Sequence, residues 1–209
     1  QPRYEGAGVL IEEGTTNLVP AFSAWGVNGC VVGGERITAS LANAFLRATF
    51  ASSVAAYAYQ AEVKQGNTGI TEIGLYDASA SNLVAKLRIT WSTRAVTLSY
   101  GTGQIFTEER ADGWLWVALK AEFPEAGSDY AYFYPAGQGI AVEGSYVFAR
   151  SPQVERKSYP TSWTDGTRSP ETLSAPVPFT PAQGGEISFI VDVNDACKRQ
   201  VADEYPRLI

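Results

Sequence analysis

Residues 54–64 have the sequence VAAYAYQAEVK, and this stretch decides the fold class. Side chains of a β-strand alternate between its two faces. Four apolar or aromatic side chains therefore fall on one side of an extended chain, namely Tyr57, Tyr59, Ala61 and Val63. This alternation is typical of a strand with one buried face. We predict a half-buried strand over 54–64.

Similar short segments recur along the chain. They lie at 70–76 (ITEIGLY), 83–91 (LVAKLRITW), 95–100 (AVTLSY), 114–123 (WLWVALKAEF), 130–135 (YAYFYP) and 144–150 (GSYVFAR). Turn-forming residues separate them, and helical periodicity is weak and confined to 40–50 and 195–204. Short, closely spaced strands of this kind predict an all-β sandwich or barrel rather than alternating strands and helices.

Composition changes after residue 158. Ser158–Pro181 is rich in Pro, Ser, Thr and Gly, which is typical of an extended linker. We predict an N-terminal arm and first strand at 1–18, the main β domain at 19–158, a proline-rich linker at 159–183, and an additional strand and tail at 184–209. That last strand either opens a following domain or pairs with a neighbouring subunit. The chain contains no Met, and we expect it to be part of a longer protein.

Charge and composition argue against several classes of partner. The 209 residues carry a net charge of −6 without a run of Lys or Arg. Nucleic acids and anionic membranes attract positive surfaces, and no apolar stretch approaches the roughly 20 residues of a membrane span. We therefore expect neither partner. Cys30 and Cys197 match no metal-ligand spacing, and we favour two free thiols over a disulfide.

Catalytic chemistry is limited because the sequence contains no histidine. Triads and metal centres that depend on imidazole are therefore absent. A carboxylate pair, as in glycoside hydrolysis, is the remaining arrangement. Its candidates are Glu108, Glu109, Asp165, Glu186 and Asp192. Glu108 and Glu109 precede an Asp-Gly turn and are more typical of a solvated loop. We expect a non-catalytic protein and keep a glycan-cleaving enzyme as an alternative.

Two segments carry a resemblance to a known family. The first is Gly8–Val19 (GVLIEEGTTNLV), followed by Phe22 and Trp25. The second is Tyr146–Ser169 (YVFARSPQVERKSYPTSWTDGTRS), with a Gln-x-Glu element and a Ser-Tyr-x-x-Thr exit. In this order they resemble the opening and closing parts of a jelly-roll module of the carbohydrate-binding-module type in phage tail-fibre and minor structural proteins. The segments YAYQAEVKQG and GWLWVAL are similar to its middle strands.

The resemblance implies an antiparallel β-sandwich of the jelly-roll type, followed by a proline-rich C-terminal extension. It implies a place on the virion surface, extracellular when assembled, and host attachment through carbohydrate. A structural capsid or tail decoration domain that contacts neighbouring subunits is the alternative, because one fold hosts many functions. We expect a homo-oligomer, since weak single sites gain affinity from multivalency.

The resemblance also suggests a site for a structural calcium ion. Related modules often carry an acidic residue just after the Phe of the opening motif, where this chain has Ser23. Glu12, Glu13 and Glu155 remain as weak candidate ligands, because calcium takes carboxylate oxygens. Otherwise Glu12 and Glu13 are solvated and Glu155 caps a turn. We expect no cofactor and leave calcium open.

Aromatic residues are the candidate ligand contacts. Sugars pack their C–H faces on aromatic rings held by a stiff scaffold, and the chain has 5 Trp and 11 Tyr. Leu115, Val117 and Leu119 should face inward, which turns Trp114 and Trp116 outward. An outward Trp116 indicates a ligand platform, a contact with a partner chain, or packing beneath a loop.

A second aromatic group lies on another predicted strand. Tyr130, Tyr132 and Tyr134 share one face, and Tyr57 and Tyr59 would lie beside them. These phenols either bind a glycan on a concave face or stand at the rim of the core with their hydroxyls in water.

Overall fold

The computed structural model describes residues 3–5, 8–10, 14–140 and 142–170. The chain divides into two compact units, and the larger one spans Gly14–Ser169. In the smaller unit, β1 (Arg3–Glu5) pairs antiparallel with β2 (Gly8–Leu10).

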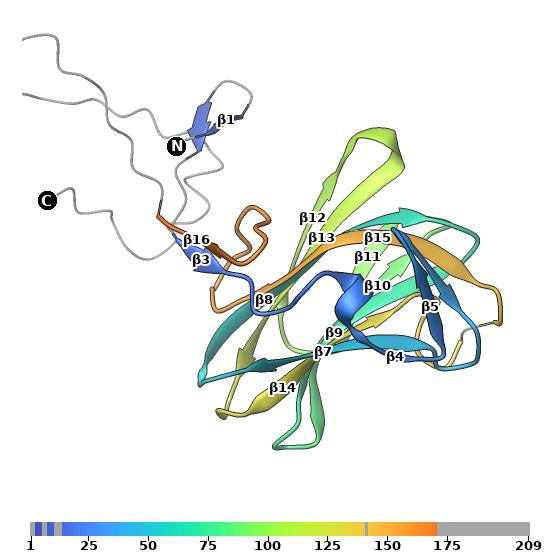
Figure 1. Cartoon of the computed structure of the whole chain (residues 1–209), viewed down its shortest axis with the longest axis horizontal. Coiled ribbons are helices and arrows are strands. Elements are labelled where there is room, and N and C mark those ends of the chain that lie inside the picture. The colour runs from blue at the N-terminus through green and yellow to red at the C-terminus, as the bar shows by residue number, and fades with distance from the viewer. Residues whose placement is uncertain (1–2, 6–7, 11–13, 141, 171–209) are drawn as a thin grey trace, which may run out of the picture. The chain divides into compact units, whose positions relative to one another are not determined.

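The larger unit is built from two six-stranded antiparallel sheets that pack face to face (Figure 1). Sheet I has the order β11-β10-β9-β14-β7-β4. Its strands are β4 (Gly26–Asn28), β7 (Phe45–Ala51), β9 (Ile70–Asp77), β10 (Asn82–Thr90), β11 (Ala95–Gly101) and β14 (Ser128–Tyr134). Sheet II has the order β12-β13-β8-β15-β6-β5. Its strands are β5 (Cys30–Gly33), β6 (Arg36–Ala39), β8 (Ala55–Gln65), β12 (Gln104–Glu109), β13 (Trp114–Phe123) and β15 (Tyr146–Glu155).

Successive strands alternate between the sheets. The chain passes from β7 in sheet I to β8 in sheet II and back to β9, and it repeats this crossing from β13 through β14 to β15. Four consecutive pairs of these strands form hairpins that stay within one sheet, namely β5–β6, β9–β10, β10–β11 and β12–β13. The predicted antiparallel sandwich of the jelly-roll type is therefore confirmed. The two described 3-10 turns are short: η1 (Phe22–Ala24) and η2 (Ala111–Gly113).

The alternation in 54–64 supplies the core, as the sequence predicts, but with a consequence for the tyrosines. Tyr57 is 2% exposed and Tyr59 is fully buried. The Tyr57 ring packs against Phe50 and Phe123, with centroids 5.5 and 5.2 Å away. The expectation that Tyr57 and Tyr59 contact a ligand is therefore wrong, because both rings point into the space between the sheets.

The weak helical periodicity at 40–50 does not lead to a helix, and strand β7 begins at Phe45 instead. Its burial alternates strictly from Phe45 to Ala51, so Leu46, Ala48 and Phe50 enter the core. Nearby, Cys30 is a buried free thiol, and burial raises its pKa to about 12. Cys197 lies outside the described residues.

The ends of the larger unit extend beyond the predicted boundaries of 19 and 158. β3 (Thr15–Thr16) pairs antiparallel with β16 (Thr167–Arg168), which joins the two ends of the unit to each other. The predicted strand at 184–193 and its tail lie outside the described residues. Within the described ranges, no helix is both long enough and apolar enough to span a membrane.

Candidate functional site

The outward side of sheet I carries a continuous group of aromatic side chains. Ala131 and Phe133 of β14 are fully buried, so Tyr130, Tyr132 and Tyr134 point away from the core, as predicted. Antiparallel pairing places β9 on one side of β14 and β7 on the other. Those strands add Tyr76 and Phe45. We call these five residues the tyrosine face.

The rings of the tyrosine face support one another. Tyr132 is the centre of the group, because its ring centroid lies within 6.0 Å of the ring centroid of every other member. Tyr76 is stacked on Tyr130 at 6.0 Å between centroids, and Tyr132 is stacked on Tyr134 at 5.7 Å. Aromatic pairs in such geometries stabilise each other beyond the area they bury. The face is therefore held in place before any ligand binds.

Arg47 of β7 extends this face. It lies opposite Tyr132 in the strand register, and its guanidinium carbon is 4.5 Å from the centre of the Tyr130 ring. Arg47 is exposed. A guanidinium over an aromatic face is attracted by the ring quadrupole. The stacking orients the Arg47 side chain while leaving its N–H groups at the surface.

An ion cluster lies beside the rings, on β9 and β10. Glu72 is fully buried although it points outward from sheet I. Its carboxylate accepts a hydrogen bond from Arg88 Nε at 2.8 Å and lies 3.3 Å from Lys86 Nζ. The backbone N–H of Gln138 also donates to Glu72 at 2.8 Å, and Lys86 Nζ donates to the Gln138 side chain at 2.9 Å. Because these groups satisfy one another, the cluster fixes the 135–140 loop over this part of the sheet.

Most polar groups of the tyrosine face have no partner within the protein. Among the described residues, no hydrogen bond involves the hydroxyls of Tyr76, Tyr130, Tyr132 or Tyr134, or the guanidinium of Arg47. Tyr76, Tyr130 and Tyr132 are half-buried, whereas Tyr134 is only 6% exposed. Burial of the Tyr134 side chain raises its pKa. The face therefore combines apolar rings with unpaired donors and acceptors.

The outward side of sheet II differs. The predicted faces of β13 are confirmed, since Leu115, Val117 and Leu119 belong to the core and Trp114 and Trp116 do not. Trp114 is nonetheless only 7% exposed. The guanidinium carbon of Arg150 lies 4.0 Å from the centre of a Trp114 ring, and Arg150 donates to Glu62 at 2.6 Å. Trp114 is therefore covered by a cation that already has its own carboxylate.

Trp116 is half-buried and hydrogen-bonded. Its indole N–H donates to the Gln60 side-chain oxygen at 2.9 Å. Gln60 in turn donates to the carbonyl oxygen of Thr161 at 2.7 Å. Thr161, in the segment that follows β15, is thus linked to Trp116 of β13 through Gln60. Of the three interpretations of an outward Trp116, packing beneath a neighbouring segment agrees best with these contacts.

The Gln-x-Glu element forms a buried hydrogen-bonded clamp with the two ends of the unit. Glu155 is fully buried and accepts three hydrogen bonds, from Thr15 Oγ1 at 2.5 Å, Thr161 Oγ1 at 2.8 Å and Thr161 N at 2.7 Å. Gln153 accepts from Thr164 N at 2.8 Å. The Asn17 side-chain oxygen accepts from the backbone N–H of Val154 at 3.1 Å. These residues tie the start and the end of the domain to β15.

The clamp bears on the calcium candidates. The Glu155 carboxylate serves as the hydrogen-bond acceptor of a turn, which agrees with the structural alternative for this residue. Glu12 and Glu13 lie outside the described residues. Within the described ranges, no group of three or more acidic or sulfur ligands could hold a metal ion.

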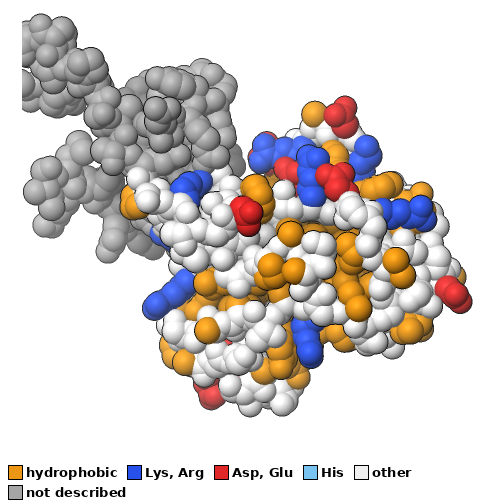
Figure 2. All heavy atoms as spheres, viewed as in Figure 1, with side chains coloured by type: hydrophobic (Ala, Val, Ile, Leu, Met, Phe, Trp, Pro, Cys, Tyr) orange, Lys and Arg blue, Asp and Glu red, His pale blue; other side chains and the backbone are white. Residues whose placement is uncertain are grey.

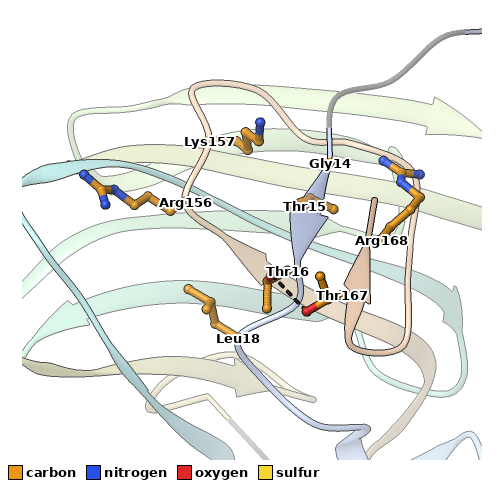
Figure 3. Close-up of a pocket in the computed structure, with 8 residues that line it drawn as sticks. All are labelled: Gly14, Thr15, Thr16, Leu18, Arg156, Lys157, Thr167 and Arg168. Carbon is orange, nitrogen blue, oxygen red and sulfur yellow. Dashed lines mark hydrogen bonds between the residues drawn. The ribbon is translucent and has the colours of Figure 1, made fainter. Parts of the chain in front are cut away.

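A small hollow lies where β3, β16 and the end of β15 meet (Figure 3). Its volume is about 250 Å3, and it is lined by Gly14, Thr15, Thr16, Leu18, Arg156, Lys157, Thr167 and Arg168. A hydrogen bond of 3.1 Å joins the hydroxyls of Thr16 and Thr167 across it. Arg156 points away from Arg168 in Figure 3, so the cationic side chains do not converge on one point. The hollow is a weaker candidate than the tyrosine face.

The three carboxylate-pair candidates within the described residues, Glu108, Glu109 and Asp165, lie outside the tyrosine face. Glu108 forms an ion pair with Arg110, and Glu109 with Arg94. Figure 2 shows side chains of both charges gathered over the projecting β12–β13 hairpin. Asp165 is exposed. Glu186 and Asp192 lie outside the described residues.

Two members of the tyrosine face, Phe45 and Tyr76, and three residues beside it, Arg47, Glu72 and Lys86, were missed from sequence. Alternation within 70–76 already places Glu72 and Tyr76 on one face of their strand. What the sequence lacked was the strand order, which brings β9, β14 and β7 together.

Comparison with known proteins adds no relative. No protein-family model matches the chain, and no curated protein matches it significantly.

Proposed function

We propose that Gly14–Ser169 is a non-catalytic carbohydrate-binding module that uses the tyrosine face. One observation carries this proposal: among the described residues, the hydroxyls of half-buried Tyr76, Tyr130 and Tyr132 and the exposed Arg47 guanidinium on the outward side of sheet I have no hydrogen-bond partner. On the outward side of sheet II, by contrast, the side chains of Trp116, Arg150 and Glu155 are hydrogen-bonded within the protein. Unpaired polar groups on a stiff aromatic surface are what a sugar requires.

The chemistry of sugars fits this surface. A sugar offers C–H groups that pack against aromatic rings and hydroxyls that exchange hydrogen bonds with polar side chains. The ring-to-ring contacts of Tyr132 restrain the surface, so less conformational freedom is lost when a ligand binds.

The biological setting of the proposal rests on the resemblance. We propose that the module belongs to a phage tail or fibre protein, is displayed on the virion surface, and attaches the particle to host carbohydrate. Copies in a homo-oligomer would bind one polysaccharide together, because tethering raises the effective concentration of each further site.

Binding of a glycan array, followed by titration of the strongest oligosaccharide, tests the proposal. Tyr132→Ala should weaken binding by about 1 to 3 kcal/mol, because it removes the ring at the centre of the face. Tyr100→Ala is the matched control, since Tyr100 is 46% exposed on β11 outside this group. Equal losses in both variants, or the absence of glycan binding, would contradict the proposal. Release of reducing sugar from a bound polysaccharide would contradict its non-catalytic part.

A second candidate function, subunit assembly, is favoured by exposed apolar side chains at one end of the sandwich. Backbone hydrogen bonds join Ser40 to Gly29 and Gly144 to Ala39, so the surrounding loops lie together. These loops and the adjoining strands expose Val27, Val31, Leu41, Ile140 and Val142 at 47 to 70%. Exposed apolar groups that gather in one region mark contact surfaces.

The oligomeric state tests assembly separately from glycan binding. Val31→Glu should lower the molar mass measured by light scattering to that of a monomer. Val54→Glu is the control, because Val54 is 67% exposed on the loop before β8. A wild-type monomer, or an oligomer that survives Val31→Glu, would contradict assembly through this end.

A further inference from the structure

The outward side of sheet I carries an excess of positive charge, although the whole chain carries −6. Three cations on its six strands point outward: Arg47, Lys86 and Arg88. Glu72 is the one outward carboxylate on these fully described strands. The other two, Asp77 and Asp129, are buried on the inward side. The outward charges therefore sum to three positive and one negative, a net of +2.

The cations differ in how much of their charge is compensated. Lys86 and Arg88 both lie against Glu72, at 3.3 and 2.8 Å. Arg47 has no carboxylate within 4 Å among the described residues, and its observed neighbour is the uncharged Tyr130 ring. Arg47 thus presents an uncompensated charge at the edge of the proposed sugar-binding surface.

Resting on the proposed function, we propose that the ligand is an acidic glycan and that Arg47 binds its carboxylate. Glycans built from uronic or sialic acids carry such groups. A guanidinium holds its N–H donors in a rigid fork that matches the two oxygens of a carboxylate. Stacking on Tyr130 holds this fork in place, and the neighbouring phenol hydroxyls supply hydrogen bonds for the sugar hydroxyls.

The other sheet provides a matched control. Arg36 of β6 is also exposed, and its guanidinium carbon lies 3.9 Å from the centre of the Tyr146 ring. Like Arg47, it has no carboxylate within 4 Å in the described part of the chain. Arg36 lies on sheet II, away from the tyrosine face. Substituting either residue removes the same charge from the same kind of stack.

The test uses the full chain and three acidic probes: oligogalacturonate, hyaluronan oligosaccharide and oligosialic acid. Each probe is paired with its carboxyl-reduced, neutral counterpart. We expect at least one acidic probe to bind, at least tenfold more tightly than its neutral counterpart, and more weakly as salt rises. Arg47→Gln should weaken this binding at least tenfold, and Arg36→Gln less than twofold.

Arg47→Lys separates charge from geometry. It keeps the cation but loses the fork, so its affinity should fall between those of wild type and Arg47→Gln. Urea unfolding of each variant establishes that it folds. Equal binding of acidic and neutral probes, or equal effects of Arg47→Gln and Arg36→Gln, would overturn the acidic-glycan inference and leave the proposed function standing. Binding only to neutral glycans of the array would do the same. No glycan binding of any kind would overturn both.

Discussion

The outward sides of the two sheets contain similar residues and use them differently. On sheet II, Trp116, Gln60 and Glu155 are linked by hydrogen bonds to the ends of the domain. On sheet I, the hydroxyl of Tyr132 and the guanidinium of Arg47 have no hydrogen-bond partners in the described protein, and Arg47 stacks on the Tyr130 ring. An outward aromatic residue such as Trp116, whose polar neighbours are bonded within the protein, is therefore weaker evidence of a binding surface than Tyr132.

The largest expected effect tests whether the clamp of sheet II is structural. Glu155→Ala leaves the hydroxyls of Thr15 and Thr161 and the Thr161 N–H without their acceptor. Leaving buried donors unsatisfied should lower the free energy of unfolding by on the order of 3 kcal/mol. Urea unfolding measures this loss, and glycan affinity at a temperature where the variant is folded should equal that of wild type. Altered glycan affinity in the folded variant would contradict the assignment of a structural role to the outward side of sheet II and a binding role to that of sheet I.

A smaller effect is expected at Trp116. Trp116→Phe keeps an aromatic ring but removes the N–H that donates to Gln60. The free energy of unfolding should fall by about 1 kcal/mol, the net value of one hydrogen bond, while glycan affinity stays constant. The two quantities are measured by urea unfolding and calorimetric titration. A tenfold loss of glycan affinity without a loss of stability would show that the binding surface lies on sheet II.

The stability of the protein at alkaline pH tests the burial of Tyr59 between the two sheets. Burial raises the pKa of Tyr59 above its usual value of 10.0. Above pH 10, the unfolded chain therefore loses a proton that the folded chain keeps, and the free energy of unfolding falls as pH rises. Tyr59→Phe should reduce this fall when unfolding is followed by urea at pH 9 and pH 11. An unchanged pH dependence would show that the Tyr59 phenol is accessible.

The smallest expected effect uses the same variant at neutral pH. The Tyr59 hydroxyl is buried and has no hydrogen-bond partner among the residues that the structure describes. An unsatisfied buried hydroxyl costs stability, so Tyr59→Phe should leave the free energy of unfolding equal to that of wild type or raise it by less than about 1 kcal/mol. A loss of more than about 1 kcal/mol at pH 7 would reveal a polar partner for this hydroxyl and contradict its unsatisfied state.

The periodicity of single strands could be predicted from sequence, because it depends only on neighbours along the chain. It placed Tyr130, Tyr132 and Tyr134 together and separated Trp116 from the core, and both placements are confirmed. It also placed Tyr57 and Tyr59 on one face. Which face of that strand meets the opposite sheet depends on the fold, and this is why both tyrosines were wrongly expected to reach a ligand.

The composition of the candidate site could not be predicted, because pairing between distant strands creates it. Tyr76 and Arg47 reach the tyrosine face only through the order β9-β14-β7. The covering of Trp116 likewise depends on Gln60 and Thr161, which come from separate parts of the chain. Alternation assigns a residue to a face, but long-range contacts decide whether that face is open.

Hydrogen exchange with and without the strongest-binding oligosaccharide of the array shows which sheet a glycan contacts. We expect slower exchange in peptides that cover β7, β9 and β14, whose side chains form the tyrosine face, and no change in β8 and β13. Protection of β13 around Trp114 and Trp116, with none in β9 and β14, would contradict this expectation.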